Sequence, residues 1–167
     1  MNPYATWASN LLRGAVILDT ETTGLDDDAQ IIQLAIIDMQ GNTLFDSLLR
    51  PSCEISAGAA AVHHITADRL IDAPTIVDVI DDVTKILFRN KVITYNADFD
   101  TRMLRQTLSA YKLDAEWMKQ VNFQCAMKMY AESIGSKKWL KLTGGNHSAV
   151  GDCLATLELL RRMAVQI

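Results

Sequence analysis

The chain has 167 residues, of which 49% are hydrophobic and 22% are charged, and its formal net charge is −4. This composition is ordinary for a globular domain with its own core, and no apolar run approaches the roughly 18 residues of a membrane span. We therefore expect one domain over residues 1–167 and no membrane partner. An acidic chain is a poor passive ligand for nucleic acid, although a protein that recruits cations can still act on phosphate esters.

The N-terminal residues lack a basic stretch followed by an apolar core, which argues against a secretory signal. The three cysteines, Cys53, Cys125 and Cys153, show no C-x-x-C spacing. This favours reduced thiols over a disulfide framework or a thiolate metal site. Together these features predict a cytoplasmic protein.

Three apolar segments open the chain and predict a meander of three strands. They lie at 14–19, 31–38 and 43–49, and Gly41-Asn42 supplies a hairpin turn between the last two. Residues 51–64 are expected to form a loop. Thr66 is the expected cap of a short helix that ends at Leu70.

The rest of the sequence alternates helices with strands. Apolar residues at helical spacing predict a helix over 76–87, and a strand at 91–95 precedes a second helical stripe from Phe99 to Tyr111. A short strand near 121–123 and a helix near 126–132 come next. Residues 133–146, with three glycines and three lysines, are expected to be a mobile loop before a last helix over 148–164. This order predicts an α/β fold, a mixed sheet in which an antiparallel meander is joined by parallel strands and flanked by helices.

Two carboxylates, Asp19 and Glu21, end the first strand. Side chains two positions apart on a strand point to the same face, roughly 6–7 Å from one another, and two such charges repel unless a cation lies between them. Mg²⁺ prefers oxygen ligands of this kind. A D-x-E pair also arises readily by chance, so two solvated acids at a strand end remain an alternative on this evidence alone.

Longer motifs surround that pair. Asp19-Thr20-Glu21-Thr22-Thr23-Gly24-Leu25 follows the first strand, and three elements come after it in order: Ala61-Val62-His63-His64-Ile65-Thr66, Asn96-Ala97-Asp98-Phe99-Asp100 and His147-Ser148-Ala149-Val150-Gly151-Asp152. Together they resemble the motifs of the DnaQ-like (DEDDh) 3′–5′ exonucleases, best known from the proofreading subunit of bacterial replicative DNA polymerase. The resemblance extends over roughly residues 14–164.

The second motif offers two aspartates, Asp98 and Asp100. Two residues along a helix correspond to about 200° around its axis, so both side chains cannot face one site. Asp98 is suited to cap the helix, whereas Asp100 holds the ligand position of the motif.

The third motif combines His147 with Asp152. A surface histidine and an acid that stabilises a helix dipole would give the same spacing. The resemblance implies instead that Asp152 is the fourth carboxylate and His147 the general base, a role that suits a side chain with an unperturbed pKa of about 6.5. Ser148 stands where a related subclass carries tyrosine, which excludes that subclass.

The resemblance implies a ribonuclease H-like fold and hydrolysis at the 3′ end of single-stranded DNA, with release of nucleoside 5′-monophosphates. Two divalent cations, Mg²⁺ or Mn²⁺, would be held by Asp19, Glu21, Asp100 and Asp152. A DNA polymerase is a further partner that the resemblance suggests.

The substrate contacts that the resemblance implies lie near the first two motifs. They are the backbone of Thr22, Thr23 and Gly24, the side chain of Leu25 as an apolar wedge, and His63, Asn96 and Phe99. Ordinary core packing is an alternative for Leu25 and Phe99, as local hydrogen bonding is for His63 or His64. Several basic side chains could meet phosphates or simply be solvated: Arg102, Arg105, Lys137, Lys138 and Lys141.

Two positions depart from the family pattern, since Tyr95 stands where histidine is frequent and His64 where glycine is usual. Neither is a ligand position. An exoribonuclease with the same five catalytic residues and a catalytically silent module that holds a nucleic-acid end are the alternative functions. The Thr22-Thr23 pair resembles the DNA-directed branch, and all five catalytic positions are filled, so we favour a DNA exonuclease.

Overall fold

The computed structural model describes residues 2–165. Within them, five strands form one sheet in the order β3-β2-β1-β4-β5. β1 is antiparallel to β2, and β2 to β3, whereas β4 pairs in parallel with both β1 and β5. The predicted mixed sheet, a meander extended by parallel strands, is therefore confirmed. The strands are β1 Ala15–Thr22, β2 Ile31–Asp38, β3 Thr43–Leu48, β4 Lys91–Thr94 and β5 Asn122–Cys125.

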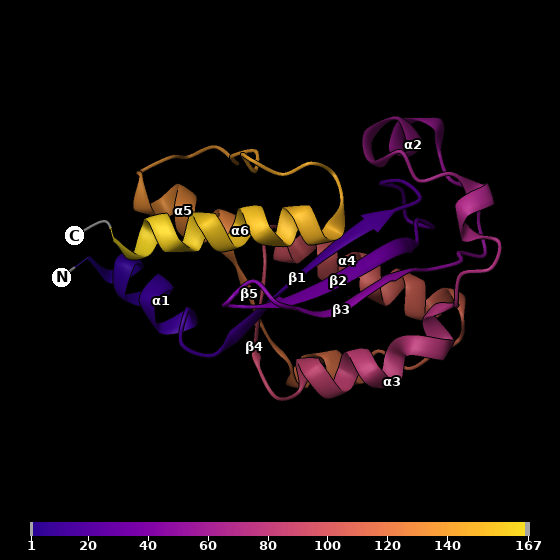
Figure 1. Cartoon of the computed structure of the whole chain (residues 1–167), viewed down its shortest axis with the longest axis horizontal. Helices are drawn as coiled ribbons and strands as arrows, with labels where there is room; N and C mark the ends of the chain where they lie inside the picture. The colour runs from indigo at the N-terminus through magenta and orange to yellow at the C-terminus, as the bar shows by residue number, and fades with distance from the viewer. Residues whose placement is uncertain (1, 166–167) are drawn as a thin grey trace.

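Helices cover both faces of this sheet, with α6 on one side of the strands and α3 on the other (Figure 1). The α-helices are α1 Pro3–Leu11, α2 Ala57–His63, α3 Ile76–Leu87, α4 Ala97–Ala110, α5 Ala126–Ser133 and α6 Ala149–Ala164. Two short 3₁₀ helices, η1 Ala67–Leu70 and η2 Glu116–Gln120, complete the described elements. No helix in this part of the chain has the length and apolar character needed to cross a bilayer.

The alternation of side chains along β1 divides the core into two layers. Val16 and Leu18 pack with residues of α3 and α4, whereas Ile17 packs with residues of α1 and α6. Because neighbouring strand residues face opposite sides, the odd-numbered positions 19 and 21 continue on the α6 side. The strand pattern thus directs both carboxylates of the first motif toward α6.

Two α-helices, α1 and α2, and the 3₁₀ helix η2 were absent from the prediction. α1 begins at the cap residue Asn2, whose side chain accepts from the N–H of Tyr4 at 3.0 Å, and its buried face (Ala5, Ala8 and Leu11) contributes to the core layer shared with α6. The loop expected over 51–64 is wrong in part, because α2 occupies its second half. The Ser56 hydroxyl accepts from the N–H of Ala59 at 3.2 Å and so begins that helix.

Candidate active site

The first two carboxylates lie on the C-terminal half of β1, which pairs with β2 on one side and extends beyond the pairing with β4 on the other. Asp19 is opposite Ala35 and Glu21 is opposite Gln33 in this pairing. The amide oxygen of Gln33 accepts from the N–H of Ala149, the first residue of α6, at 3.2 Å. The strand pair that carries Glu21 therefore also fixes the start of the helix that carries the third motif.

Asp152 lies in the first turns of α6, which Ser148 caps by accepting from the N–H of Gly151 at 3.2 Å. The carboxylates of Asp19, Glu21 and Asp152 come together, since one oxygen from each lies within 4.8 Å of the other two. Two segments more than 130 residues apart thus form one acidic cluster.

Asp100 approaches this cluster from the opposite side of the sheet, on α4. Its carboxylate is buried and accepts a hydrogen bond from the Thr20 hydroxyl at 2.8 Å. Burial raises the pKa of Asp100 to about 7, although the hydrogen bond from Thr20 acts in the other direction.

Asp98 points away from the cluster. It is exposed and forms an ion pair with Lys128 at 2.7 Å. The expectation that Asp98 caps α4 is wrong, because the helix already begins at Ala97, and Asn96 is the cap residue. Asp98 and Asp100 were expected to lie about 200° apart around the helix axis, on different faces. The structure agrees, since Asp98 is exposed and Asp100 is buried.

The carboxylates of the acidic cluster are more stable with a bound proton or cation than in the ionised state alone. Burial, followed by repulsion from Asp100, Asp152 and Glu21, holds the pKa of Asp19 well above its usual range. Burial and repulsion from Asp152 and Asp100 raise the pKa of Glu21 to about 7. Carboxylate oxygens in this arrangement fit hard divalent cations, which neutralise the repulsion that closeness creates.

His147 lies at the mouth of the same site. A cavity of about 180 Å³ is lined by Asp19, Glu21, Asp100, Asp152 and His147 together. His147 is exposed and has a left-handed backbone conformation, with φ of 58°. Its N–H donates to Oδ1 of Asp152 at 3.2 Å, so the histidine backbone is tied to one of the clustered acids.

A second hollow, of about 470 Å³, opens beside the acidic cluster and shares Thr20, Glu21 and Phe99 with its cavity. Its wall includes Thr22, Gly24, Leu25, Val62, His63 and Phe99. Leu25 is 75% exposed, so it is available to a ligand and is not a core residue. Phe99 borders both spaces, whereas Asn96 lines only the cavity of the carboxylates.

Thr23 and His63 have internal partners. The Thr23 hydroxyl is buried and accepts from the N–H of Gln30 at 2.9 Å. In His63, Nδ1 accepts from the N–H of Ile65 at 3.0 Å, so Nε2 is the nitrogen that donates to the Thr22 carbonyl at 3.1 Å. Burial lowers the pKa of His63, which agrees with a neutral ring. His63 thus holds the end of β1 against α2.

The two departures from the family pattern have clear conformational roles. His64 ends α2 with φ of 58°, a conformation that glycine adopts at lower cost. The Tyr95 hydroxyl donates to the Leu140 carbonyl at 2.6 Å and so attaches the segment between α5 and α6 to the end of β4. A loop was predicted over 133–146, and the segment without helix or strand is observed over 134–148.

Among the basic candidates, Arg102 contacts two of the residues that line the 470 Å³ hollow. Its guanidinium lies over the Phe99 ring, 5.6 Å from the centroid, and donates to the Leu25 carbonyl at 3.3 Å. Arg105 is exposed, as are Lys137, Lys138 and Lys141 in the segment before α6.

The sequence prediction did not include several wall residues. Gly58, Ala59 and Val62 reach the 470 Å³ hollow because α2 exists, and the serine cap with the following alanines was the signal for that helix. Leu142 also lines the 180 Å³ cavity. It reaches this place through contact between segments distant in the chain, and no local sequence pattern predicts such a contact.

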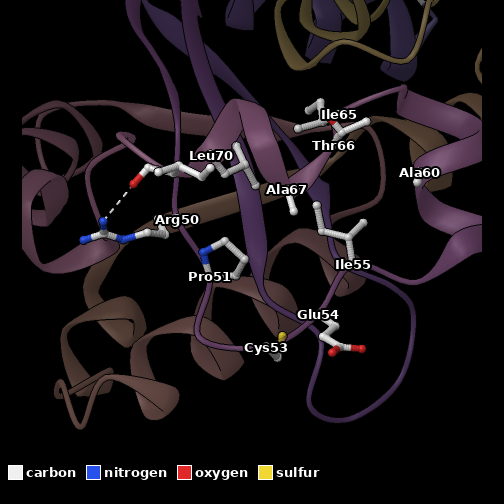
Figure 2. A pocket seen from close by; sticks show the side chains of 11 residues that line it. Arg50, Pro51, Cys53, Glu54, Ile55, Ala60, Ile65, Thr66, Ala67 and Leu70 are labelled. Carbon is white, nitrogen blue, oxygen red and sulfur yellow. Dashed lines mark hydrogen bonds between the residues drawn. The ribbon is translucent and has the colours of Figure 1, made fainter.

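A further pocket, of about 560 Å³, lies between 50–55 and 65–71, with Ala60 of α2 at its border (Figure 2). Its walls are mainly aliphatic, and the Arg50 guanidinium is held by the Ile71 carbonyl at 2.9 Å. None of the five candidate catalytic residues lines it. It is separate from the acidic cluster.

Comparisons with known proteins identify a family for this chain. A family model described as exonuclease (RNase_T) matches residues 16–160. The uncharacterized exonuclease CP81 of Escherichia phage 186 is 35% identical, over 89% of this chain and 87% of its own length. The DNA polymerase III subunit epsilon of Rickettsia felis is 33% identical over 58% of this chain, which spans only 45% of that subunit. A structure of exonuclease X with 5′-overhanging duplex DNA superposes with a TM-score of 0.67 at 27% identity, covering 89% of this chain and 90% of that one.

Proposed function

This chain belongs to the exonuclease family, of the DnaQ-like 3′–5′ type, and from that premise we propose that it removes nucleotides from the 3′ end of single-stranded DNA. The products are nucleoside 5′-monophosphates and a strand one nucleotide shorter. The observation that carries the proposal is the convergence of Asp19, Glu21 and Asp152 within 4.8 Å, in a cavity that Asp100 and His147 also line.

Members of this family use divalent metals. In this chain Asp19, Glu21, Asp100 and Asp152 would hold two such ions, Mg²⁺ or Mn²⁺. The raised pKa values of Asp19, Glu21 and Asp100 support this assignment, because the carboxylates need positive charge to be ionised together. When bound, the cations supply Lewis-acid stabilisation of the phosphate oxygens and of the departing 3′-oxygen.

His147 is the proposed general base. It takes a proton from the attacking water as the new phosphorus–oxygen bond forms, and the bond between phosphorus and the 3′-oxygen of the remaining strand breaks. That 3′-oxygen then takes up a proton and becomes the new terminal hydroxyl. The exposure of His147 at the mouth of the cavity lets it return its proton to solvent after each cycle.

The 470 Å³ hollow is the proposed seat of the terminal nucleoside. Leu25, Val62 and Phe99 offer apolar contacts to a base, while the backbone near Thr22 and Gly24 offers polar groups to the sugar. Hydrogen bonds of Thr23 and His63 hold this wall in place. Asn96, which lines the acidic cavity together with Phe99, is the proposed contact for the phosphate region.

A defined experiment tests the function. A 5′-labelled 20-mer of single-stranded DNA is incubated with the protein and Mg²⁺, and an RNA of the same sequence is treated in parallel. We expect a ladder of products shortened from the 3′ end of the DNA, abolished by EDTA. The Asp19→Asn variant should give no ladder.

A matched control is Asp82→Asn, which removes an exposed acid on α3 that pairs with Lys85. This variant should digest the DNA at the wild-type rate. Full activity of Asp19→Asn, or digestion without any divalent cation, contradicts the proposal. Faster digestion of the RNA would instead assign the enzyme to RNA.

A further inference from the structure

An exposed tryptophan stands in the segment between α5 and α6. Trp139 is 64% exposed, and the Lys128 ammonium lies over its ring, 5.8 Å from the centroid. The ammonium group covers one face of the indole, and much of the ring remains in contact with solvent. An indole surface of this kind is suited to stack on a nucleic-acid base.

Positive charge gathers around this ring, although the whole chain is acidic. Four of its sixteen basic residues, Lys128, Lys137, Lys138 and Lys141, fall within 128–141, where Glu132 is the single acid. Lys137, Lys138 and Lys141 are exposed. The segment therefore has a formal charge of +3 in a chain of −4, which makes it a part of the surface that attracts a polyanion.

The aromatic and basic segment is attached directly to the rim of the acidic cavity. The Tyr95 hydroxyl holds the Leu140 carbonyl, next to Trp139, and Tyr95 itself lines the cavity. Lys128 is held by Asp98, which is next to Phe99 in the chain. In Figure 1 this segment runs alongside α6 toward the end that carries Asp152.

Charge also gives a direction to a strand that leaves the cavity. On the side of the 470 Å³ hollow, Asp26, Asp27 and Asp28 are exposed directly after Leu25. Those carboxylates repel a phosphate backbone, whereas the lysines of the segment that Tyr95 attaches to the cavity attract one. A strand whose terminal nucleoside occupies the hollow is therefore drawn past Tyr95 toward Trp139.

We propose that Trp139, with Lys137, Lys138 and Lys141, forms a binding site for the part of a single-stranded DNA that lies 5′ of the cleaved phosphate. Trp139 stacks on a base and the lysines contact backbone phosphates. The inference rests on the proposed function, because it takes the acidic cavity as the place where the strand is cleaved. It adds a contact for long strands that a dinucleotide is too short to reach.

The test compares two substrates, a dT12 strand and a dinucleotide. Base–aromatic stacking contributes on the order of tenfold in affinity per base, so Trp139→Ala should lower the ratio of kcat/KM for dT12 to that for the dinucleotide about tenfold. The loss should appear in KM for dT12. Trp139→Phe, which keeps an aromatic ring, should retain most of the ratio.

The lysines are tested through salt. Replacing Lys137, Lys138 and Lys141 together by glutamine should reduce the slope of log affinity for fluorescein-labelled dT12 against log salt by roughly two, since each single-strand phosphate contact contributes about 0.7. Affinity is measured by anisotropy in Ca²⁺. The matched control replaces Lys85, Lys91 and Lys119, which are exposed on α3, β4 and η2, and should leave the slope unchanged.

The outcomes separate this inference from the function itself. Cleavage of both substrates with an unchanged ratio in Trp139→Ala overturns the Trp139 site and leaves the exonuclease in place. An equal loss on both substrates also overturns it and makes Trp139 a residue that positions the His147 segment. Binding of dT12 that depends on Trp139 without any cleavage supports the site and contradicts the proposed function.

Discussion

Oδ1 of Asp152 accepts a hydrogen bond from the main-chain N–H of His147 at 3.2 Å, and a second from the N–H of Asn146 at 3.0 Å. The candidate general base is thus tied through its backbone to a candidate metal ligand. Any change that displaces this carboxylate should move both groups together.

Gly145 provides the means to disturb that contact. A Cβ at this position would overlap Oδ1 and the carboxyl carbon of Asp152, so Gly145→Ala must shift the carboxylate or the backbone that it holds. Hydrogen bonds to charged groups contribute about 1.5–3 kcal/mol, so we expect kcat to fall about ten- to a hundredfold. Steady-state kinetics on dT12 give the measurement.

Gly14→Ala is the control for this change, because a Cβ there meets no atom within 4 Å. It should retain wild-type kcat. If Gly145→Ala were equally active, the tie between Asp152 and the His147 backbone would have no part in catalysis.

Removal of the His147 side chain should separate binding from cleavage. His147→Ala keeps the four carboxylates and the backbone contact to Asp152, so its affinity for dT12 in Ca²⁺ should match the wild type. General-base catalysis contributes about 10²–10⁴ in rate, and kcat in Mg²⁺ should fall by that factor. A parallel loss of affinity and rate would argue for a structural role of His147. The control is His64→Ala, which removes another exposed histidine and should keep the wild-type kcat.

The stability of the metal-free protein should depend on pH through the acidic cluster. Glu21 and Asp100 have folded pKa values of about 7, above their usual range near 4, so between these limits the folded state binds more protons than the unfolded one. This contribution to the free energy of unfolding is therefore present below pH 4 and is lost as pH rises to 7. His63 acts in the opposite direction, since its pKa is lowered.

Urea unfolding in EDTA at pH 5 and pH 8 measures this effect, and Asp100→Asn isolates it from His63. The variant should gain stability relative to the wild type on going from pH 5 to pH 8, by about 2 kcal/mol. Mg²⁺ at pH 8 should restore the free energy of unfolding that the wild type loses at this pH. An identical pH dependence in the two proteins would show that Asp100 is already ionised in the folded state.

His64→Gly should stabilise the protein. The left-handed conformation at φ of 58° costs a residue with a Cβ about 1–2 kcal/mol, part of which is offset by the greater freedom of glycine in the unfolded chain. We expect a net gain of about 0.5–1 kcal/mol in the free energy of unfolding, measured by urea denaturation. A loss of stability would mean that the His64 side chain makes a favourable contact.

The sequence predicted the acidic cluster because its motifs fix local positions on elements of known geometry. Alternation along β1 places Asp19 and Glu21 on one face, and helical spacing separates Asp100 from Asp98. The predicted cap of α4 was wrong because the helix starts two residues earlier than a cap at Asp98 would place it. A cap depends on where the chain leaves β4, which spacing alone does not determine.

The missed parts depend on contacts between distant segments or on short elements. α2 has seven residues, and its Gly58 weakens the pattern that would identify it, although Ser56 was a usable signal. α1 had an asparagine cap and a proline at its start. The attachment of Leu140 to Tyr95 joins residues 45 apart in sequence, and no local pattern predicts it.

The packing of α1 against α6 has a practical consequence for joining this chain to other proteins. Both the beginning of α1 and the end of α6 lie on the side of the molecule opposite the carboxyl end of β1 (Figure 1). A tether or a fluorescent tag fused at either of these helix ends would leave the entrance to the acidic cavity unobstructed. Surface immobilisation through the same side would present the cavity to solution, as single-molecule recording of strand digestion requires.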